Sequence, residues 1–166
     1  MEYEESMRAI TVHRPWDKLI LSHGKNIENR SWRPPDSLIG QRLAIHAGKK
    51  IDNAGIARLM GILRGDKLAY AHDAQTLCGE AGVIVGVVMV GGWVKAAYQG
   101  GLVAQSSNFG ERVAYDYLNS NWFDGPYGWV LENPIALRNP IPCKGQQRLW
   151  NVPEILEAEI YEQLRG

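Results

Sequence analysis

The chain has 166 residues, enough for one compact domain and too few for two of ordinary size. Hydrophobic residues make up 45% of it and charged residues 22%, which excludes a disordered chain. Lysine plus arginine and aspartate plus glutamate each number 18, so the formal net charge is zero. That balance argues against a nonspecific duplex-DNA binder, which needs a broad positive field. A small recognition pocket needs only a few well-placed charges and remains open.

Cysteine usage and the start of the chain indicate the compartment. The two cysteines, Cys78 and Cys143, form no CxxC or Cys/His cluster, so we expect reduced thiols, no metal site and no cofactor. The first five residues are acidic where a signal peptide needs positive charge. The longest apolar stretch, residues 83–90, is far shorter than the ~20 residues of a membrane span. We therefore expect a cytoplasmic protein, or a nuclear one in a nucleated cell, that has no membrane partner.

The first half of the chain carries regular hydrophobic patterns. Apolar residues at three- and four-residue spacing indicate helices, and short apolar or alternating runs indicate strands. Pro15 fits a first helical turn, and Gly24 supplies a stop. The pattern predicts strands at 7–12, 26–32 and 42–47, and helices at 15–23 and 51–63.

The second half has one strong strand pattern, at 83–90, where nearly every residue is apolar and most are β-branched. A further strand is predicted at 128–133, ended by Pro134, and a closing helix at 153–164. Residues 64–80 are polar and irregular. Residues 95–124 read as an insertion or flexible loop with a helical turn near 113–118. Several short strands and few helices predict an α+β fold, a small β-barrel of mixed or antiparallel strands with helices packed outside, as a single domain over 1–166.

Residues 13–32 concentrate tryptophans and charges. On a strand, Glu28, Arg30 and Trp32 share one face, and Lys25 lies in the turn before them. Such a face offers a stacking surface, a bidentate donor and an acceptor, the groups that hold an unpaired base and its phosphate. The alternative interpretation is a structural ion pair between Glu28 and Arg30, with the tryptophans in the core.

Three motifs in order resemble the ASCH domain family (activating signal cointegrator homology) of the PUA-like superfamily. They are His13-Arg14-Pro15-Trp16 with Gly24-Lys25-x-x-Glu28-x-Arg30, then Gly128-Trp129-Val130-Leu131-Glu132-Asn133-Pro134, then Pro142-Cys143-Lys144-Gly145-x-x-x-Leu149-Trp150. The resemblance implies a PUA-like β-barrel with a cleft between barrel and helices. The implied ligand is single-stranded or modified RNA or a nucleotide, with single-stranded DNA as a further option.

Carried over to this sequence, the resemblance implies most of a set of ligand-binding residues, to which the strand faces add Trp32 and His46. The Lys/Glu/Arg motif would form the floor of the cleft. The residues around the floor would come from the helix start, the second strand and the late turn. The predicted set is Arg14, Trp16, Lys25, Glu28, Arg30, Trp32, His46, Lys49 and Lys144.

The alternative function is a metal-independent hydrolase acting on RNA or on a modified nucleoside. In the bacterial acetylcytidine amidohydrolases that resemble this family, a threonine follows the motif lysine by three residues and takes part in catalysis. Glu28 stands there in this chain, so amide hydrolysis is not expected. Ribonuclease-like cleavage needs an acid and a base near the phosphate, and Lys25, Glu28 and Tyr127 are the candidates, with His46 and Lys144 as further ones.

Overall fold

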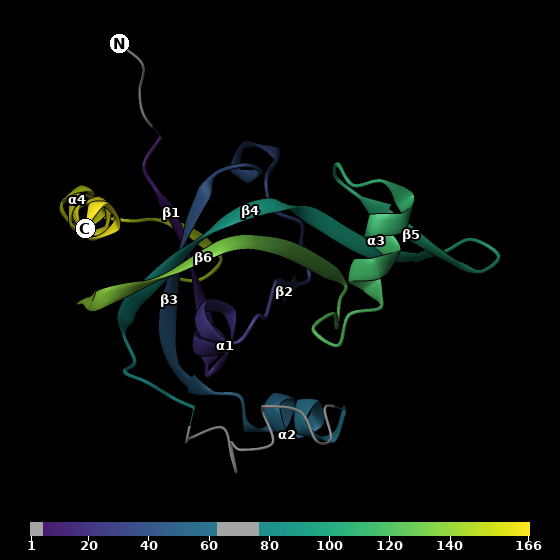
Figure 1. The fold of residues 1–166 in the computed structure, drawn as a ribbon, viewed down its shortest axis with the longest axis horizontal. Helices are drawn as coiled ribbons and strands as arrows, with labels where there is room; N and C mark the ends of the chain where they lie inside the picture. The colour runs from purple at the N-terminus through teal and green to yellow at the C-terminus, as the bar shows by residue number, and fades with distance from the viewer. Residues whose placement is uncertain (1–4, 63–76) are drawn as a thin grey trace.

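The computed structural model describes residues 5–62 and 77–166, which form one mixed sheet and surrounding helices (Figure 1). The strands of the described part are β1 Arg8–Arg14, β2 Ile27–Arg30, β3 Arg42–Ile51, β4 Val83–Tyr98, β5 Leu102–Ser106, β6 Tyr127–Pro142 and β7 Leu149–Asn151. The helices are α1 Trp16–Ser22, α2 Asn53–Ile62, α3 Glu111–Leu118 and α4 Glu154–Arg165, with a 3₁₀ turn at Asp36–Leu38.

The sheet curls into a half-barrel. Its strand order is β2-β6-β4-β3-β1-β7, and β5 pairs with the far end of β4. The β1–β3 pair is parallel, and every other described pair is antiparallel. Helix α1 packs against β1, β3, β4 and β6 and fills the hollow of the curl (Figure 1). The predicted α+β small barrel with peripheral helices is confirmed.

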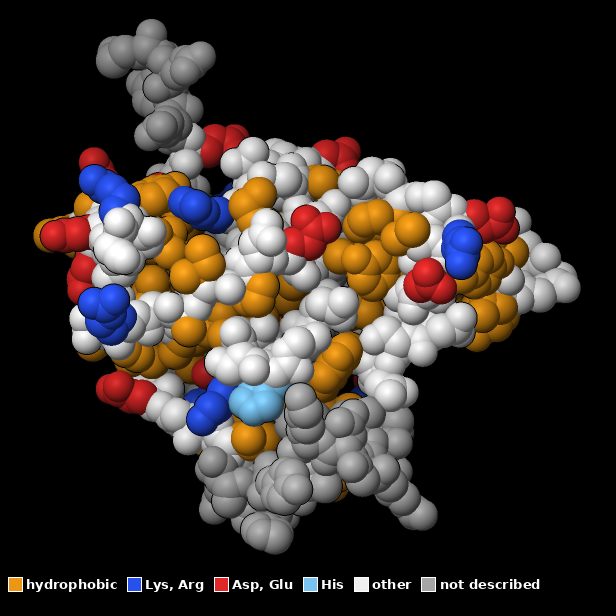
Figure 2. Space-filling model, viewed as in Figure 1, with side chains coloured by type: hydrophobic (Ala, Val, Ile, Leu, Met, Phe, Trp, Pro, Cys, Tyr) orange, Lys and Arg blue, Asp and Glu red, His pale blue; other side chains and the backbone are white. Residues whose placement is uncertain are grey.

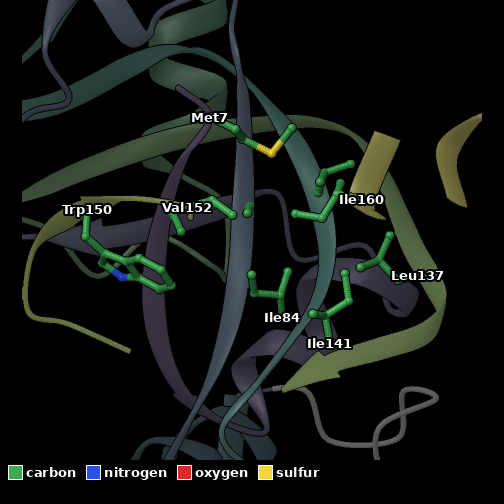
Figure 3. Close-up of a cluster of buried hydrophobic side chains, with 10 residues drawn as sticks. Met7, Ile84, Leu137, Ile141, Trp150, Val152 and Ile160 are labelled. Carbon is green, nitrogen blue, oxygen red and sulfur yellow. The ribbon is translucent and has the colours of Figure 1, made fainter. Parts of the chain in front are cut away.

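The sheet is buried on both faces. Inside the curl, Ile10, Val12, Ile20 and Trp129 belong to one apolar cluster. A second cluster, which includes Trp150 of β7 and Ile160 of α4, covers the other side (Figure 3). A central strand between two cores must be apolar on both faces, which explains the unbroken apolar run of 83–90.

Both long strands extend beyond their predicted ends because they contain β-bulges. Strand β6 does not end at Pro134: Met89 pairs with Glu132 and Val87 with Ile135, so β6 carries one extra residue there, and Asn133 has a φ of 47°. The proline lies in this bulge, where no ladder N–H is needed. Strand β4 likewise continues through Gly92 (φ 151°), where a side chain would collide with residues 107–109.

Residues 95–124 are regular rather than irregular. They contain the end of β4, strand β5 and helix α3, which includes the helical turn predicted at 113–118. Val94, Ala114 and Val130 form a small core beneath them. That this segment is an insertion, and that the chain is one domain, remain predictions. Most of the predicted irregular segment 64–80 lies outside the described residues.

Candidate functional site

A cleft of about 360 Å³ opens beside α1, at the edge of the half-barrel. Four segments of the chain line it: the end of β1 with the start of α1, the turn after α1 with β2, the start of α2, and the loop before β6. The lining residues are Thr11, Val12, His13, Trp16, Lys25, Glu28, Asn29, Arg30, Asp52, Gly55, Arg58, Leu59, Asn121, Trp122, Phe123 and Asp124. Its volume is that of a small-molecule site.

The floor of the cleft is a charged triad built by the turn after α1 and by β2. The Lys25 ammonium is 3.6 Å from one oxygen of Glu28, and Arg30 Nε is 3.2 Å from the other. Lys25 also donates to the carbonyl of Ile27, and Arg30 Nη2 donates to the carbonyl of Thr11 at 2.9 Å. Lys25 is 5% exposed, and this burial lowers its pKa, an effect that the neighbouring Glu28 opposes. Glu28 thus neutralises the two cations from between them.

One wall of the cleft is the indole of Trp16, held from two sides. Its Nε1 donates to Asp52 Oδ2 at 2.9 Å, and the Lys25 ammonium lies 5.3 Å from its ring centre. The backbone N–H of Gly55 donates to the other oxygen of Asp52 at 2.9 Å. Burial alone would raise the pKa of Asp52, but these two donors, with the charges of His13 and Arg58, hold that pKa below its usual value.

A further part of the lining is the loop of residues 119–126, which carries Trp122. Asn29 of β2 fastens it: its side-chain amide donates to the carbonyl of Trp122 at 2.9 Å, and its oxygen accepts from the backbone N–H of Asp124 at 2.8 Å and of Gly125 at 3.1 Å. Arg58 of α2 makes two 2.9 Å contacts with the carboxylate of Asp124. The loop is therefore tied to both the sheet and α2.

Comparison with known proteins gives one curated relative over nearly the whole chain. Human activating signal cointegrator 1 is 22% identical over 157 residues, which cover 93% of this chain and 23% of the relative. The motifs noted in the sequence lie within this match. The chain is therefore similar to the ASCH domain family. It spans about a quarter of the length of that relative.

Solved structures of an ASCH protein from Zymomonas mobilis are also similar. The parent protein is 14% identical with a TM-score of 0.48, covering 96% of this chain and 94% of its own. A point mutant of it is 15% identical with a TM-score of 0.49, covering 96% of each chain. No protein-family model matches the sequence.

The structure brings four of the predicted residues together at the cleft, whereas three others make structural contacts elsewhere. Trp16, Lys25, Glu28 and Arg30 line the cleft. Arg14 instead clamps β1 to β3, donating to the carbonyls of Gly48, Lys49 and Gly79 at 2.8–3.0 Å.

Trp32 and His46 also lie outside the cleft. β2 ends at Arg30, so the strand alternation that would put Trp32 beside Glu28 stops, and Trp32 packs edge-on against Trp129 at 4.8 Å. His46 is 3% exposed, with Nε2 2.6 Å from the carbonyl of Cys143 and Nδ1 3.1 Å from Thr11 Oγ1. Burial lowers its pKa, and its contacts join β3 to the closing turn.

The last three candidates are surface residues or belong to another depression. Lys49 and Lys144 are exposed and do not line the cleft. Tyr127 faces Lys95, whose ammonium is 4.8 Å from its ring. The acid–base set available in the cleft is therefore Lys25 and Glu28, without Tyr127, His46 or Lys144.

Sequence reasoning missed several lining residues. His13 is exposed and lines the cleft. It belongs to the first quoted motif, so the sequence did carry a signal for it. Asp52, Arg58, Asn29 and Trp122 had no such signal, because each takes its place through a contact distant in sequence, such as the 93-residue separation between Asn29 and Trp122.

Positive and negative charges are balanced in the cleft and on the surface face shown in Figure 2. Lys25, Arg30 and Arg58 are matched in the lining by Glu28, Asp52 and Asp124. On the face shown in Figure 2, basic and acidic side chains are interspersed. Within residues 5–62 and 77–166, no three His, Cys, Asp or Glu side chains are grouped to hold a metal ion. None of the helices in these ranges has the length and apolarity needed to cross a membrane.

Proposed function

We propose that the cleft binds one unpaired nucleotide of RNA, with the base inside and the phosphate at the mouth. The observation that carries this proposal is the charged triad on the floor. Glu28 already neutralises Lys25 and Arg30, so a buried phosphate would meet a carboxylate rather than unpaired positive charge. A neutral, planar and polar group is the better match, and a nucleobase is such a group.

The walls supply what a base requires. Trp16 is fixed by Asp52 and Lys25, so little conformational entropy is lost when a base stacks on it. Trp122 is a second indole in the lining. The polar atoms of Glu28 and Arg30 offer an acceptor and a donor to the edge of the base. At the mouth, exposed His13 is the proposed contact for the phosphate, since Arg58 is already paired with Asp124; Lys49 and Lys144 remain proposed contacts for outer phosphates.

A titration of the four nucleoside monophosphates and of short RNA and DNA of one sequence, at two salt concentrations, tests the proposal. Trp16→Ala should weaken binding by roughly 1–3 kcal/mol, the usual contribution of one base stacked on an aromatic ring. Trp16→Phe keeps an aromatic ring on which a base can stack, so it should lose less binding free energy than Trp16→Ala. Lys25→Met should leave the salt dependence of binding unchanged. If Lys25 contacted a phosphate, its loss in this variant would make the salt dependence shallower. Failure of the parent protein to bind any member of the panel would contradict the proposal.

Metal-independent hydrolysis is the second candidate, on a separate observation. Lys25 is buried beside a carboxylate and its pKa is lowered by that burial, a combination found at catalytic sites. Incubation with single-stranded RNA in the presence of a chelator, and separately with acetylcytidine, distinguishes catalysis from binding. RNA cleavage that is lost in Lys25→Met would favour a ribonuclease. We expect no turnover of acetylcytidine, because Glu28 occupies the position of the catalytic threonine.

A further inference from the structure

A second depression begins where β2 ends, directly beyond the cleft. Its volume is about 640 Å³, and we call it the arginine–tryptophan groove after its lining residues Ser31, Trp32, Arg33, Tyr127 and Arg148. Ser31 follows Arg30 of the cleft floor along the chain. Tyr127 is paired with the same Arg30 across the β2–β6 ladder. The cleft and the groove therefore adjoin at Arg30.

Cations lie over aromatic rings in and beside this groove. The guanidinium of Arg148 is 4.3 Å from the ring centre of Trp32, and that of Arg33 is 5.6 Å from the ring centre of Trp93. Trp93 in turn packs edge-on against Tyr127 at 5.5 Å. The rings are held in place from below: Trp129 packs against Trp32 and donates its indole N–H to the Trp32 carbonyl at 2.9 Å. Aromatic rings in fixed positions thus lie beneath the exposed guanidinium groups of Arg33 and Arg148.

The groove differs from the cleft in its charge. Within the part of the chain that the structure describes, neither Arg33 nor Arg148 forms an ion pair with a carboxylate. Both arginines are exposed, and Asp36 is the acidic residue in the lining. Positive charge that is not neutralised by the protein is available to a phosphate, in contrast to the charge of Lys25 and Arg30.

The backbone of Arg148 adds an independent observation. Its φ of 59° lies in the left-handed region, which arginine adopts infrequently. The surrounding structure keeps it there, just before β7, and in this conformation its guanidinium lies over Trp32. A disfavoured backbone conformation that positions an exposed functional group motivates a functional hypothesis.

We propose that the arginine–tryptophan groove is a second subsite, which binds the RNA nucleotides next to the one in the cleft. The proposal rests on the function proposed for the cleft and extends it from one nucleotide to a strand. A base stacks on the guanidinium plane of Arg148, which Trp32 supports, and Arg33 binds a phosphate. The strand passes from cleft to groove over Arg30, along the edge formed by β2.

The experiment compares a single ribonucleotide with a nonanucleotide RNA, because a single nucleotide cannot fill cleft and groove together. Arg148→Gln should weaken nonanucleotide binding about 5- to 150-fold, the effect of one lost stacking contact, and leave single-nucleotide binding unchanged. Arg33→Gln should make the salt dependence of the nonanucleotide shallower by about 0.7 in the log–log slope, as for one lost phosphate contact. Arg42→Gln is the matched control, since Arg42 is also an exposed arginine over an aromatic ring, 5.9 Å from Tyr161, in a different depression.

The outcomes separate the two proposals. Absence of binding of either ligand to the parent protein would contradict the function proposed for the cleft. Normal single-nucleotide binding without tighter nonanucleotide binding would overturn the groove alone. The groove is also overturned if Arg148→Gln weakens both ligands equally, or acts no differently from Arg42→Gln. Both arginines are exposed, so unchanged thermal melts of the variants verify that the fold is intact.

Discussion

Arg58 and Asp124 form a two-point ion pair across the mouth of the cleft, with both nitrogen–oxygen distances at 2.9 Å. The pair joins α2 to the loop of residues 119–126. Both side chains are more than half exposed, at 59% and 54%. Because exposed pairs are screened by water and salt, we expect a coupling free energy of only about 0.2–1 kcal/mol despite the good geometry. A double-mutant cycle with Arg58→Gln and Asp124→Asn, followed by urea unfolding, measures it. A coupling above about 2 kcal/mol at moderate salt would contradict this expectation.

Glu28 should be far more important for stability. In Glu28→Gln, the buried Lys25 loses its carboxylate partner and Arg30 loses its contact on the same group. Breaking a buried pair in this way costs roughly 3–5 kcal/mol of unfolding free energy. Lys25→Met is the control, because methionine removes the buried charge and still fills the space of the lysine stem. This variant should lose less unfolding free energy than Glu28→Gln. Equal unfolding free energies for the parent and Glu28→Gln would show that the triad is not structurally coupled.

The Trp16–Asp52 hydrogen bond predicts a pH dependence. The folded-state pKa of Asp52 lies below its ordinary value of 3.8, so ionised Asp52 contributes stability above that value and the contribution is lost as pH falls through the folded pKa. Trp16→Phe removes the indole donor and should bring this pKa upward. The stability difference between the parent and Trp16→Phe should therefore be greatest above the ordinary pKa of 3.8 and shrink as the pH falls through the folded-state pKa. Unfolding titrations across this range measure it, with Trp122→Phe as the matched control. A difference that stays constant with pH would argue against the assignment.

The floor of the cleft could be predicted from sequence because it is local. Lys25, Glu28 and Arg30 are separated by two or three residues in a turn and one short strand, so strand alternation alone brings them together. Trp32 was wrongly grouped with them for the same reason. The alternation rule holds only while the strand lasts, and β2 ends at Arg30.

The closing-turn motif was predictive of the family but not of the cleft. Gly145 lies against the buried ring of His46, where an added Cβ would come within 2.6 Å of it. The motif therefore preserves a close approach between the turn and β3, and Lys144 beside it is exposed. The second wall of the cleft had no sequence signal at all, since Trp122 is positioned by Asn29 and by the ion pair from α2.

Asn29 provides the last test, because it connects the second wall of the cleft to the sheet. Its amide makes three hydrogen bonds to the loop, through the carbonyl of Trp122 and the backbone N–H groups of Asp124 and Gly125. Asn29→Ala removes all three. Water can replace the bond to the exposed Asp124, whereas the other two are partly buried, so we expect a loss of about 1–3 kcal/mol in unfolding free energy. Hydrogen exchange at the amides of Asp124 and Gly125 should accelerate, while that of the central strands changes only with global stability.

At temperatures where Asn29→Ala is still folded, nucleotide affinity should fall, because the loop that carries Trp122 is no longer fixed to β2. The matched control is Asn26→Ala, the same substitution three residues earlier at an exposed site whose side chain makes no hydrogen bond to the described residues. Asn26→Ala should leave exchange and binding as in the parent. If Asn29→Ala accelerates loop exchange but binds nucleotides with unchanged affinity, Trp122 is not part of the base-binding site, and stacking in the cleft depends on Trp16 alone.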